Sequence, residues 1–234
     1  MKIDKKTRLL IISPHPDDEA IGCGGLIGKC KKERAAGFIV YACVGESRQL
    51  VTGKTTRLTR KKEIKQIEKY SGFRTKVFYE GDEFCRLDKV PQKDLIENIE
   101  DIVEKFKPNI AVIPYPTSFN QDHRALYEAC IAALRPVPAT LRNFVSDVLI
   151  FYEPYFWNTA DFIKPNAFLN LSEKIGNQNL FDFKINLYKC HKTQVREEPF
   201  SRSIKNLERW AYIFGKEIGV DLAEAYHLTR TKID

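Results

Sequence analysis

Residues 8–19 read RLLIISPHPDDE, an apolar run followed at once by two prolines, a histidine and three acidic residues. The run from Arg8 to Ser13 is short, continuous and bounded by turn-forming residues, which is typical of a strand buried on both faces of a parallel sheet. In an open parallel sheet, ligands bind beyond the carboxyl ends of the strands. The segment therefore predicts a central strand with a polar site at its end.

Outward from this segment, apolar runs alternate with stretches of helical period. A helix is expected over Glu19 to Ala36, with Gly37 as its C-cap. Further strands are expected at 38–44, 76–79, 109–115 and 148–152, and helices at 57–71, 91–106 and from His123 to about Leu134. This alternation predicts right-handed βαβ units. The expected fold is therefore α/β, a Rossmann-like doubly wound sheet that is mostly parallel and has helices on both faces.

One domain is expected for the whole chain, residues 1–234, because this length is enough to bury a substantial core. The Rossmann-like part should span about residues 8–153. An extension over about 154–234 shows a weaker pattern, with helices near 172–190 and 201–217 and an extended stretch near 223–229. The extension is thus expected to add helical and extended segments to the core.

Composition places the chain among ordinary globular proteins, with 43% hydrophobic and 29% charged residues and a mean hydropathy of −0.37. The N-terminal apolar run breaks at Ser13-Pro14 and lacks a signal-peptide cleavage site, and no segment approaches the roughly 20 apolar residues of a membrane span. We expect a cytoplasmic protein without a transmembrane segment, and leave homo-oligomerisation open. Six dispersed cysteines without a CxxC pair indicate reduced core residues rather than a cysteine zinc finger.

The net charge of +7 includes a dense basic run between Lys54 and Lys76. Such a run can attract an anionic partner, whether a nucleotide-sugar, a phospholipid headgroup or a nucleic acid. Glu63 and Glu68 interrupt it, however, aromatic residues are almost absent from it, and no nucleic-acid motif accompanies it. We therefore expect a solvated helix face and no nucleic-acid partner.

Two polar clusters follow predicted strands. His15 and Asp18 come directly after the first strand, and His123 ends the sequence NQDH after the strand expected at 109–115. Histidine and aspartate are zinc ligands, and a catalytic zinc site uses three protein ligands with a fourth position for water. These three residues supply such a set, and Asp17 beside them is the natural general base.

A turn with an aspartate cap is the plainer interpretation of His-Pro-Asp, and Asp17 or Asp18 could simply be the N-cap of the following helix. The chain has only four histidines, however, and two of them fall at the ends of central strands beside acids. This coincidence favours a metal site, while His227 reads as structural. A glycine cluster in the first helix fits no G-x-G-x-x-G register and indicates close packing of helix on sheet: Gly22, Gly24, Gly25 and Gly28.

The two clusters together resemble the LmbE/PIG-L family of zinc-dependent N-deacetylases, through PHPDDE at 14–19 and DHRA at 122–125. Weaker similarity runs through Gly45-Glu46, Arg60, Glu63 and the HKTQ segment at 191–194, so it covers most of the chain. Carried over by position, the resemblance implies that zinc is bound by three residues and that Asp17 is the base. The implied ligands are His15, Asp18 and His123.

The activity that the resemblance implies is that of a metal-dependent hydrolase of a linear amide bond, which removes the acetyl group from an N-acetylated amino sugar. The substrate would be an N-acetylglucosamine conjugate such as a glycolipid, a nucleotide-sugar or a polysaccharide precursor. Two alternatives remain: an amidase on another acyl group or on a thiol-sugar conjugate, and a non-catalytic sugar- or nucleotide-binding module of the same fold. Divalent iron or cobalt could occupy the same ligand set in place of zinc.

One position departs from the family pattern. Many members have a histidine three residues before the last zinc ligand, where this chain has Asn120. An asparagine amide can donate a hydrogen bond to an oxyanion, but it cannot transfer a proton. Either Asp17 moves both protons, or another group such as His191 approaches the site, or activity is weak. Arg60 is a further candidate for contact with the substrate.

Overall fold

The computed structural model describes residues 1–49, 53–81, 86–138, 140–153 and 162–232. Within these residues, a seven-stranded sheet has the strand order β5-β2-β1-β6-β7-β11-β8. Its first five strands are parallel: β5 (Arg74–Glu80), β2 (Ala36–Val44), β1 (Arg8–Ser13), β6 (Ile110–Ile113) and β7 (Asp147–Phe151). The last two strands, β11 (Ala223–Arg230) and β8 (Ala167–Asn170), run antiparallel to their neighbours. The predicted single-domain, mostly parallel α/β fold is confirmed.

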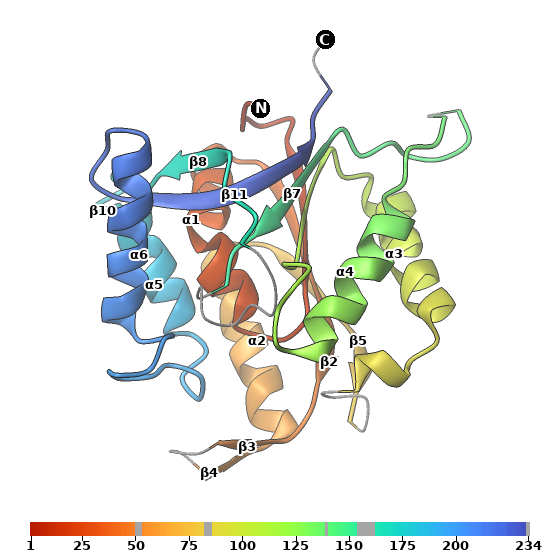
Figure 1. Cartoon of the computed structure of the whole chain (residues 1–234), viewed down its shortest axis with the longest axis horizontal. Coiled ribbons are helices and arrows are strands. Elements are labelled where there is room, and N and C mark those ends of the chain that lie inside the picture. The colour runs from red at the N-terminus through yellow and green to blue at the C-terminus, as the bar shows by residue number, and fades with distance from the viewer. Residues whose placement is uncertain (50–52, 82–85, 139, 154–161, 233–234) are drawn as a thin grey trace.

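Helices cover both faces of the sheet, as expected (Figure 1). One face packs against α1 (Asp18–Lys32), α2 (Arg57–Ser71) and α5 (Leu180–Tyr188). The opposite face packs against α3 (Gln92–Phe106) and α4 (Gln121–Ala133), and α6 (Ile204–Glu217) lies on β11. Short elements complete the described part: the hairpins β3 (Ser47–Gln49) with β4 (Gly53–Thr55) and β9 (Lys174–Ile175) with β10 (Gln178–Asn179), and the 3-10 turn η1 (Leu87–Lys89).

The central strand β1 is buried on both sides because its side chains alternate between the two faces. Leu9 and Ile11 belong to the core under α1 and α5, whereas Leu10 and Ile12 belong to the core under α3 and α4. All four are at most 1% exposed. The continuous apolar run is therefore what a strand between two helical layers requires.

Successive strands are added first to one side of β1 and then to its other side. Strands β2 and β5 follow on one side of β1, and β6 and β7 follow on the other. The carboxyl ends of β1 and β6 therefore border a topological switch point, which is where ligands bind in open α/β sheets. Both polar clusters of the sequence leave the sheet at this point.

The prediction that Gly37 caps the first helix was wrong. Helix α1 ends at Lys32, and the chain turns through Arg34, whose φ of 58° lies in the left-handed region. Gly37 lies inside β2, where a Cβ atom would be 2.1 Å from the ring of Phe73. Packing against a distant aromatic side chain, and not the end of a helix, is what requires glycine here.

The helix expected near residues 172–190 is also shorter than the sequence suggested. It begins only at Leu180, because the chain first forms the β9–β10 hairpin, whose turn contains Gly176 at φ 57°. The last extended stretch is β11, which joins the main sheet between β7 and β8. The C-terminal part thus contributes two strands to the same sheet as the N-terminal part.

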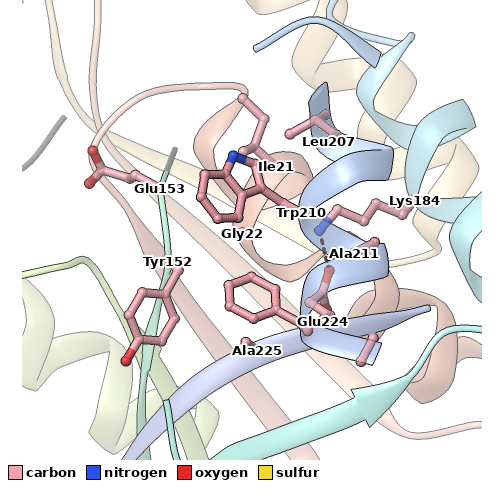
Figure 2. A pocket seen from close by; sticks show the side chains of 12 residues that line it. Ile21, Gly22, Tyr152, Glu153, Lys184, Leu207, Trp210, Ala211, Glu224 and Ala225 are labelled. Atoms are coloured by element: carbon pink, nitrogen blue, oxygen red, sulfur yellow. Dashed lines mark hydrogen bonds and ion pairs between the residues drawn. The ribbon is translucent and has the colours of Figure 1, made fainter. Parts of the chain in front are cut away.

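The glycine cluster of α1 does bring the helix close to the sheet and to α5. A Cβ atom at Gly22 would lie 2.3 Å from the Phe151 ring, and one at Gly25 would lie 3.0 Å from the Glu224 carboxylate. That buried carboxylate, carried by β11, accepts hydrogen bonds from the backbone N–H groups of Gly25 and Leu26, each at 2.9 Å. It also pairs with Lys184 at 2.7 Å, beside a cavity of about 40 Å³ between α1, α6 and β11 (Figure 2).

The surface agrees with the interpretation of the basic run as a solvated helix face. On α2 the exposed residues include Lys61, Lys62, Lys65 and Lys69. Arg60 and Glu63, on the same helix, are instead buried. Among the described residues, five cysteines are free thiols, as predicted; Cys85 lies outside this part. No described helix is both long enough and apolar enough to cross a membrane.

Candidate active site

The first cluster forms the connection between β1 and α1. The backbone N–H of His15 donates to Asp18 Oδ2 at 3.0 Å, and the Ser13 hydroxyl donates to the backbone carbonyl of His15 at 2.9 Å. Prolines on both sides of His15 restrict the same backbone. As a result, His15 Nδ1 and Asp18 Oδ2 lie 3.4 Å apart.

The second cluster forms the start of α4. Asn120 is the N-cap of this helix, and its side-chain oxygen accepts the N–H of Asp122 at 2.9 Å. The helix therefore begins before His123, earlier than predicted, and its first turn carries Asp122 and His123 towards the end of β1. His123 Nε2 lies 3.3 Å from Asp18 Oδ2.

Three side-chain donors from the two clusters converge. The ligand atoms of His15, Asp18 and His123 all lie within 4.8 Å of one another, and all three residues are buried. Each histidine uses its other ring nitrogen to bind a carboxylate: His15 Nε2 lies 2.8 Å from Asp122 Oδ2, and His123 Nδ1 bonds to Glu153. Carboxylates placed in this way fix the rings of metal-binding histidines. The donor set thus fits a divalent metal.

A second group of donors, made of His15, Cys43 and Asp122, overlaps the first. In this second group, the Asp122 oxygen already bonds to His15 Nε2, and Cys43 Sγ lies 3.6 Å from the same oxygen. The first group, in contrast, presents the histidine nitrogens that these carboxylates leave available. We therefore place the candidate metal centre at the first group.

The two outer carboxylates are themselves held in place. Asp122 Oδ1 accepts the backbone N–H of Leu87 at 2.9 Å, and Glu153 Oε2 accepts the Ser118 hydroxyl at 2.8 Å. Sequence reasoning did not assign either carboxylate a role. Glu153 lies two residues after the end of β7, so the rule that ligands gather at the carboxyl ends of strands could have found it.

These contacts shift the pKa values of the groups in the buried cluster. Burial lowers the pKa of His123, but the carboxylates of Glu153 and Asp18 outweigh this effect and raise the pKa to about 9. Burial raises the pKa of Asp18, whereas His123 and His15 hold it well below the usual value. Without a metal, the raised pKa of His123 therefore favours a protonated imidazole at neutral pH. Metal binding at such a cluster is coupled to proton release.

Replacing Glu153 by glutamine should weaken metal binding about 10- to 100-fold, because a neutral amide polarises the His123 ring less than a carboxylate does. Calorimetric titration of metal-free protein with zinc would measure the change. Glu173→Gln is the matched control, since Glu173 pairs with Lys29 and Lys32 on the surface. Equal zinc affinity in wild type and Glu153→Gln would contradict this role for Glu153.

Asp17 occupies the N-cap position of α1 but does not cap it. Its side chain makes no capping hydrogen bond, and its backbone has φ 130° and ψ −31°. For a residue with a side chain, such a conformation costs about 1–3 kcal/mol and persists only where the surroundings enforce it. The alternative that Asp17 is merely a helix cap does not account for its side chain.

Several contacts enforce the conformation of Asp17. Its N–H donates to Glu19 at 3.0 Å, and the carbonyl before it, on Pro16, accepts the guanidinium of Arg60. Its carboxylate accepts Arg202 Nη1 at 2.7 Å through Oδ2, and Oδ1 lies 3.6 Å from Arg60 Nη2. Burial raises the pKa of Asp17, although Arg202 opposes this shift.

His191 and Arg60 lie behind this loop and outside the donor group. His191 is fully buried, with Nε2 2.6 Å from Glu19, the residue that also accepts the Asp17 N–H. Arg60 is 3% exposed. Beside His191, Thr193 donates its N–H to Glu63 at 2.7 Å. Arg60, Glu63 and the segment at 191–194, which sequence similarity linked to the motif, therefore lie together beside the Asp17 loop. Sequence reasoning missed Arg202, and its local pattern carried no signal.

Known proteins of similar structure include the N,N'-diacetylchitobiose deacetylase of Pyrococcus horikoshii. That structure superposes with a TM-score of 0.75 at 20% sequence identity, covering 96% of this chain and 84% of the other. At this level of identity the likeness concerns the fold. It extends over nearly the whole chain, so the C-terminal strands β8 and β11 belong to the shared architecture.

Two curated relatives of similar sequence are also named as deacetylases. The chain is 26% identical over 228 residues to a diacetylchitobiose deacetylase of Thermococcus kodakarensis, covering 93% of this chain and 81% of the relative. It is 32% identical over 147 residues to a probable N-acetyl-alpha-D-glucosaminyl L-malate deacetylase 2 of Bacillus subtilis, covering 55% and 61%. The PIG-L family model, described as GlcNAc-PI de-N-acetylase, matches residues 10–134, more than half of the sequence. Together with the fold and the two motifs, this match shows that the chain belongs to the PIG-L family.

Proposed function

We propose that this protein is a zinc-dependent N-deacetylase that hydrolyses the acetamide of an N-acetylglucosamine conjugate. The observation that carries the proposal is the convergence of His15, Asp18 and His123, with Asp17 buried beside them and outside the donor group. The two curated relatives are named as deacetylases of N-acetylated sugars, which supports the same substrate class.

The metal would be held by His15, Asp18 and His123, three protein ligands of the kind that leave a position open in catalytic zinc sites. Divalent iron or cobalt suits the same ligands. We propose zinc because histidine and aspartate are common ligands of catalytic zinc. A metal bound there would polarise the amide carbonyl and lower the pKa of water. The side chains around the metal would carry out the remaining steps of the hydrolysis.

Asp17 would act as the general base, taking a proton from the attacking water and then delivering it to the leaving amine. Its burial suits this task, since the carboxylate is screened from bulk solvent and its pKa is raised. Asn120 is the candidate oxyanion donor. Because its side-chain oxygen accepts the N–H of Asp122, any such donation would come from Nδ2.

The test is a measurement of metal content and of amine release by the purified protein. N,N'-diacetylchitobiose and N-acetylglucosaminyl malate are the first substrates, with N-propionyl analogues to separate the acetyl-specific enzyme from an amidase for other acyl groups. Near-stoichiometric metal with release of acetate supports the proposal. Faster release of the longer acyl group favours the amidase, and sugar binding without turnover favours a binding module. A protein that binds no divalent metal contradicts the mechanism.

A further inference from the structure

The side chain of Asp17 takes a direction that its position does not favour. An aspartate at the N-cap of a helix normally accepts a backbone N–H from the first turn. In α1 this bond is absent, and the carboxylate instead accepts Arg202 Nη1 at 2.7 Å, from a residue 185 positions later in the chain. The direction of the carboxylate is therefore set by a contact between the two ends of the fold.

Arg202 is presented by a well-anchored segment. The hydroxyl of the fully buried Tyr188 lies 3.1 Å from the backbone carbonyl of Arg202 and 2.8 Å from that of Gln194, so the one hydroxyl hydrogen is shared between the two. The next residue, Ser203, caps α6 by accepting the N–H of Asn206 at 3.2 Å. With its backbone held on both sides, Arg202 can direct its guanidinium at one point with little conformational freedom left to lose.

A second cation also faces the carboxylate of Asp17. Arg60 Nη2 pairs with Asp17 Oδ1 at 3.6 Å, but its hydrogen bond goes to the carbonyl of Pro16. His191 bonds to Glu19. Among the described residues, Arg202 is thus the cation that donates a hydrogen bond to the carboxylate itself. A charge-assisted bond of this kind is about twice as strong as a neutral one.

We propose that Arg202 is a positioning residue, which holds the carboxylate of Asp17 turned away from its helix and towards the reacting water. The proposal rests on the function proposed above, in which Asp17 is the general base. Because proton transfer needs the base within hydrogen-bond reach of the water, loss of this contact lowers the rate of hydrolysis more than the affinity for the substrate.

The kinetic test compares Arg202→Ala and Arg202→Lys with wild type. The alanine variant should lose about 10- to 100-fold in kcat, with KM within about twofold of wild type and metal content unchanged. Lysine, which keeps the charge but has a different geometry, should give an intermediate kcat. Guanidinium chloride at low millimolar concentration should partly restore the alanine variant, whereas sodium chloride at equal ionic strength should not. Arg209→Ala is the matched control, because Arg209 pairs with Glu198 on the surface.

A crystal structure of Arg202→Ala gives a readout that does not depend on activity. We expect the Asp17 carboxylate to rotate and accept an N–H of the first turn of α1, as an unrestrained N-cap aspartate does. An unmoved carboxylate, an unchanged kcat, or a raised KM with normal kcat would each overturn the proposal, the last by making Arg202 a substrate contact. If wild type hydrolyses no N-acetylated sugar, the proposed function fails while the crystal structure still decides the orientation. If the alanine variant does not fold, the lysine variant decides, since wild-type kcat there contradicts the role.

Discussion

The His123→Ala variant is expected to contain almost no metal and to show no measurable deacetylation. His123 is one of three converging donors, and it links the start of α4 to the start of α1 through the 3.3 Å approach of its Nε2 to Asp18. Two remaining ligands cannot complete a site that uses three. The loss should exceed the roughly 10- to 100-fold loss of affinity expected when a carboxylate behind a ligand is changed.

Elemental analysis of the purified variants, together with zinc titration, measures this effect. His227→Ala is the control, because His227 lies on β11 and its Nδ1 is 3.2 Å from the carbonyl of Lys164, a contact outside the donor group. That variant should keep wild-type metal content and activity. Full metal occupancy in His123→Ala would show that the metal lies elsewhere, and the proposed centre would have to be abandoned.

The Asp17→Asn variant should keep its metal but lose about 10²- to 10⁴-fold in kcat, the range that a general base contributes. An asparagine has nearly the same shape and its side-chain oxygen can still accept Arg202 Nη1, so the loop should keep its conformation. Only the ability to take a proton is removed. Steady-state kinetics and metal analysis on the same preparation separate the two effects.

Asp101→Asn provides a control for the change of charge, because Asp101 is an exposed partner of Lys105 on α3. It should be indistinguishable from wild type. If Asp17→Asn retained its activity, another group would have to serve as the base. If it lost its metal, Asp17 would be a ligand, and the assignment of Asp18 would need to be exchanged with it.

The sheet could be predicted largely from local pattern because strands between two helical layers are apolar along their whole length, as β1 is. The ends of the helices and strands could not be predicted from local pattern. Helix α1 ends near Arg34, which adopts a left-handed conformation that pattern reasoning reserves for glycine, while Gly37 is needed because of the Phe73 ring. The second of these facts depends on a contact that is distant in sequence.

The candidate site, too, was only partly predictable from local sequence. The converging group is encoded in two short motifs at strand ends, so His15, Asp18 and His123 could be proposed as ligands from residue type and position. Of the carboxylates that orient the histidines, Asp122 lies within the second motif, whereas Glu153 follows β7. Arg202, which contacts Asp17, precedes α6. The strand-end rule points to Glu153, but the pairing of Arg202 with Asp17 depends on the packing of the whole fold.

Helix α1 begins with Asp18. Farther along this helix, the backbone N–H groups of Gly25 and Leu26 donate to the carboxylate of Glu224 on β11. During synthesis, both motifs leave the ribosome about a hundred residues or more before this carboxylate does. Strand β11 also separates β7 from β8, so β8 has no place in the sheet until β11 has entered it. A nascent chain that already has every proposed metal ligand therefore still lacks the carboxylate that binds two amides of its first helix.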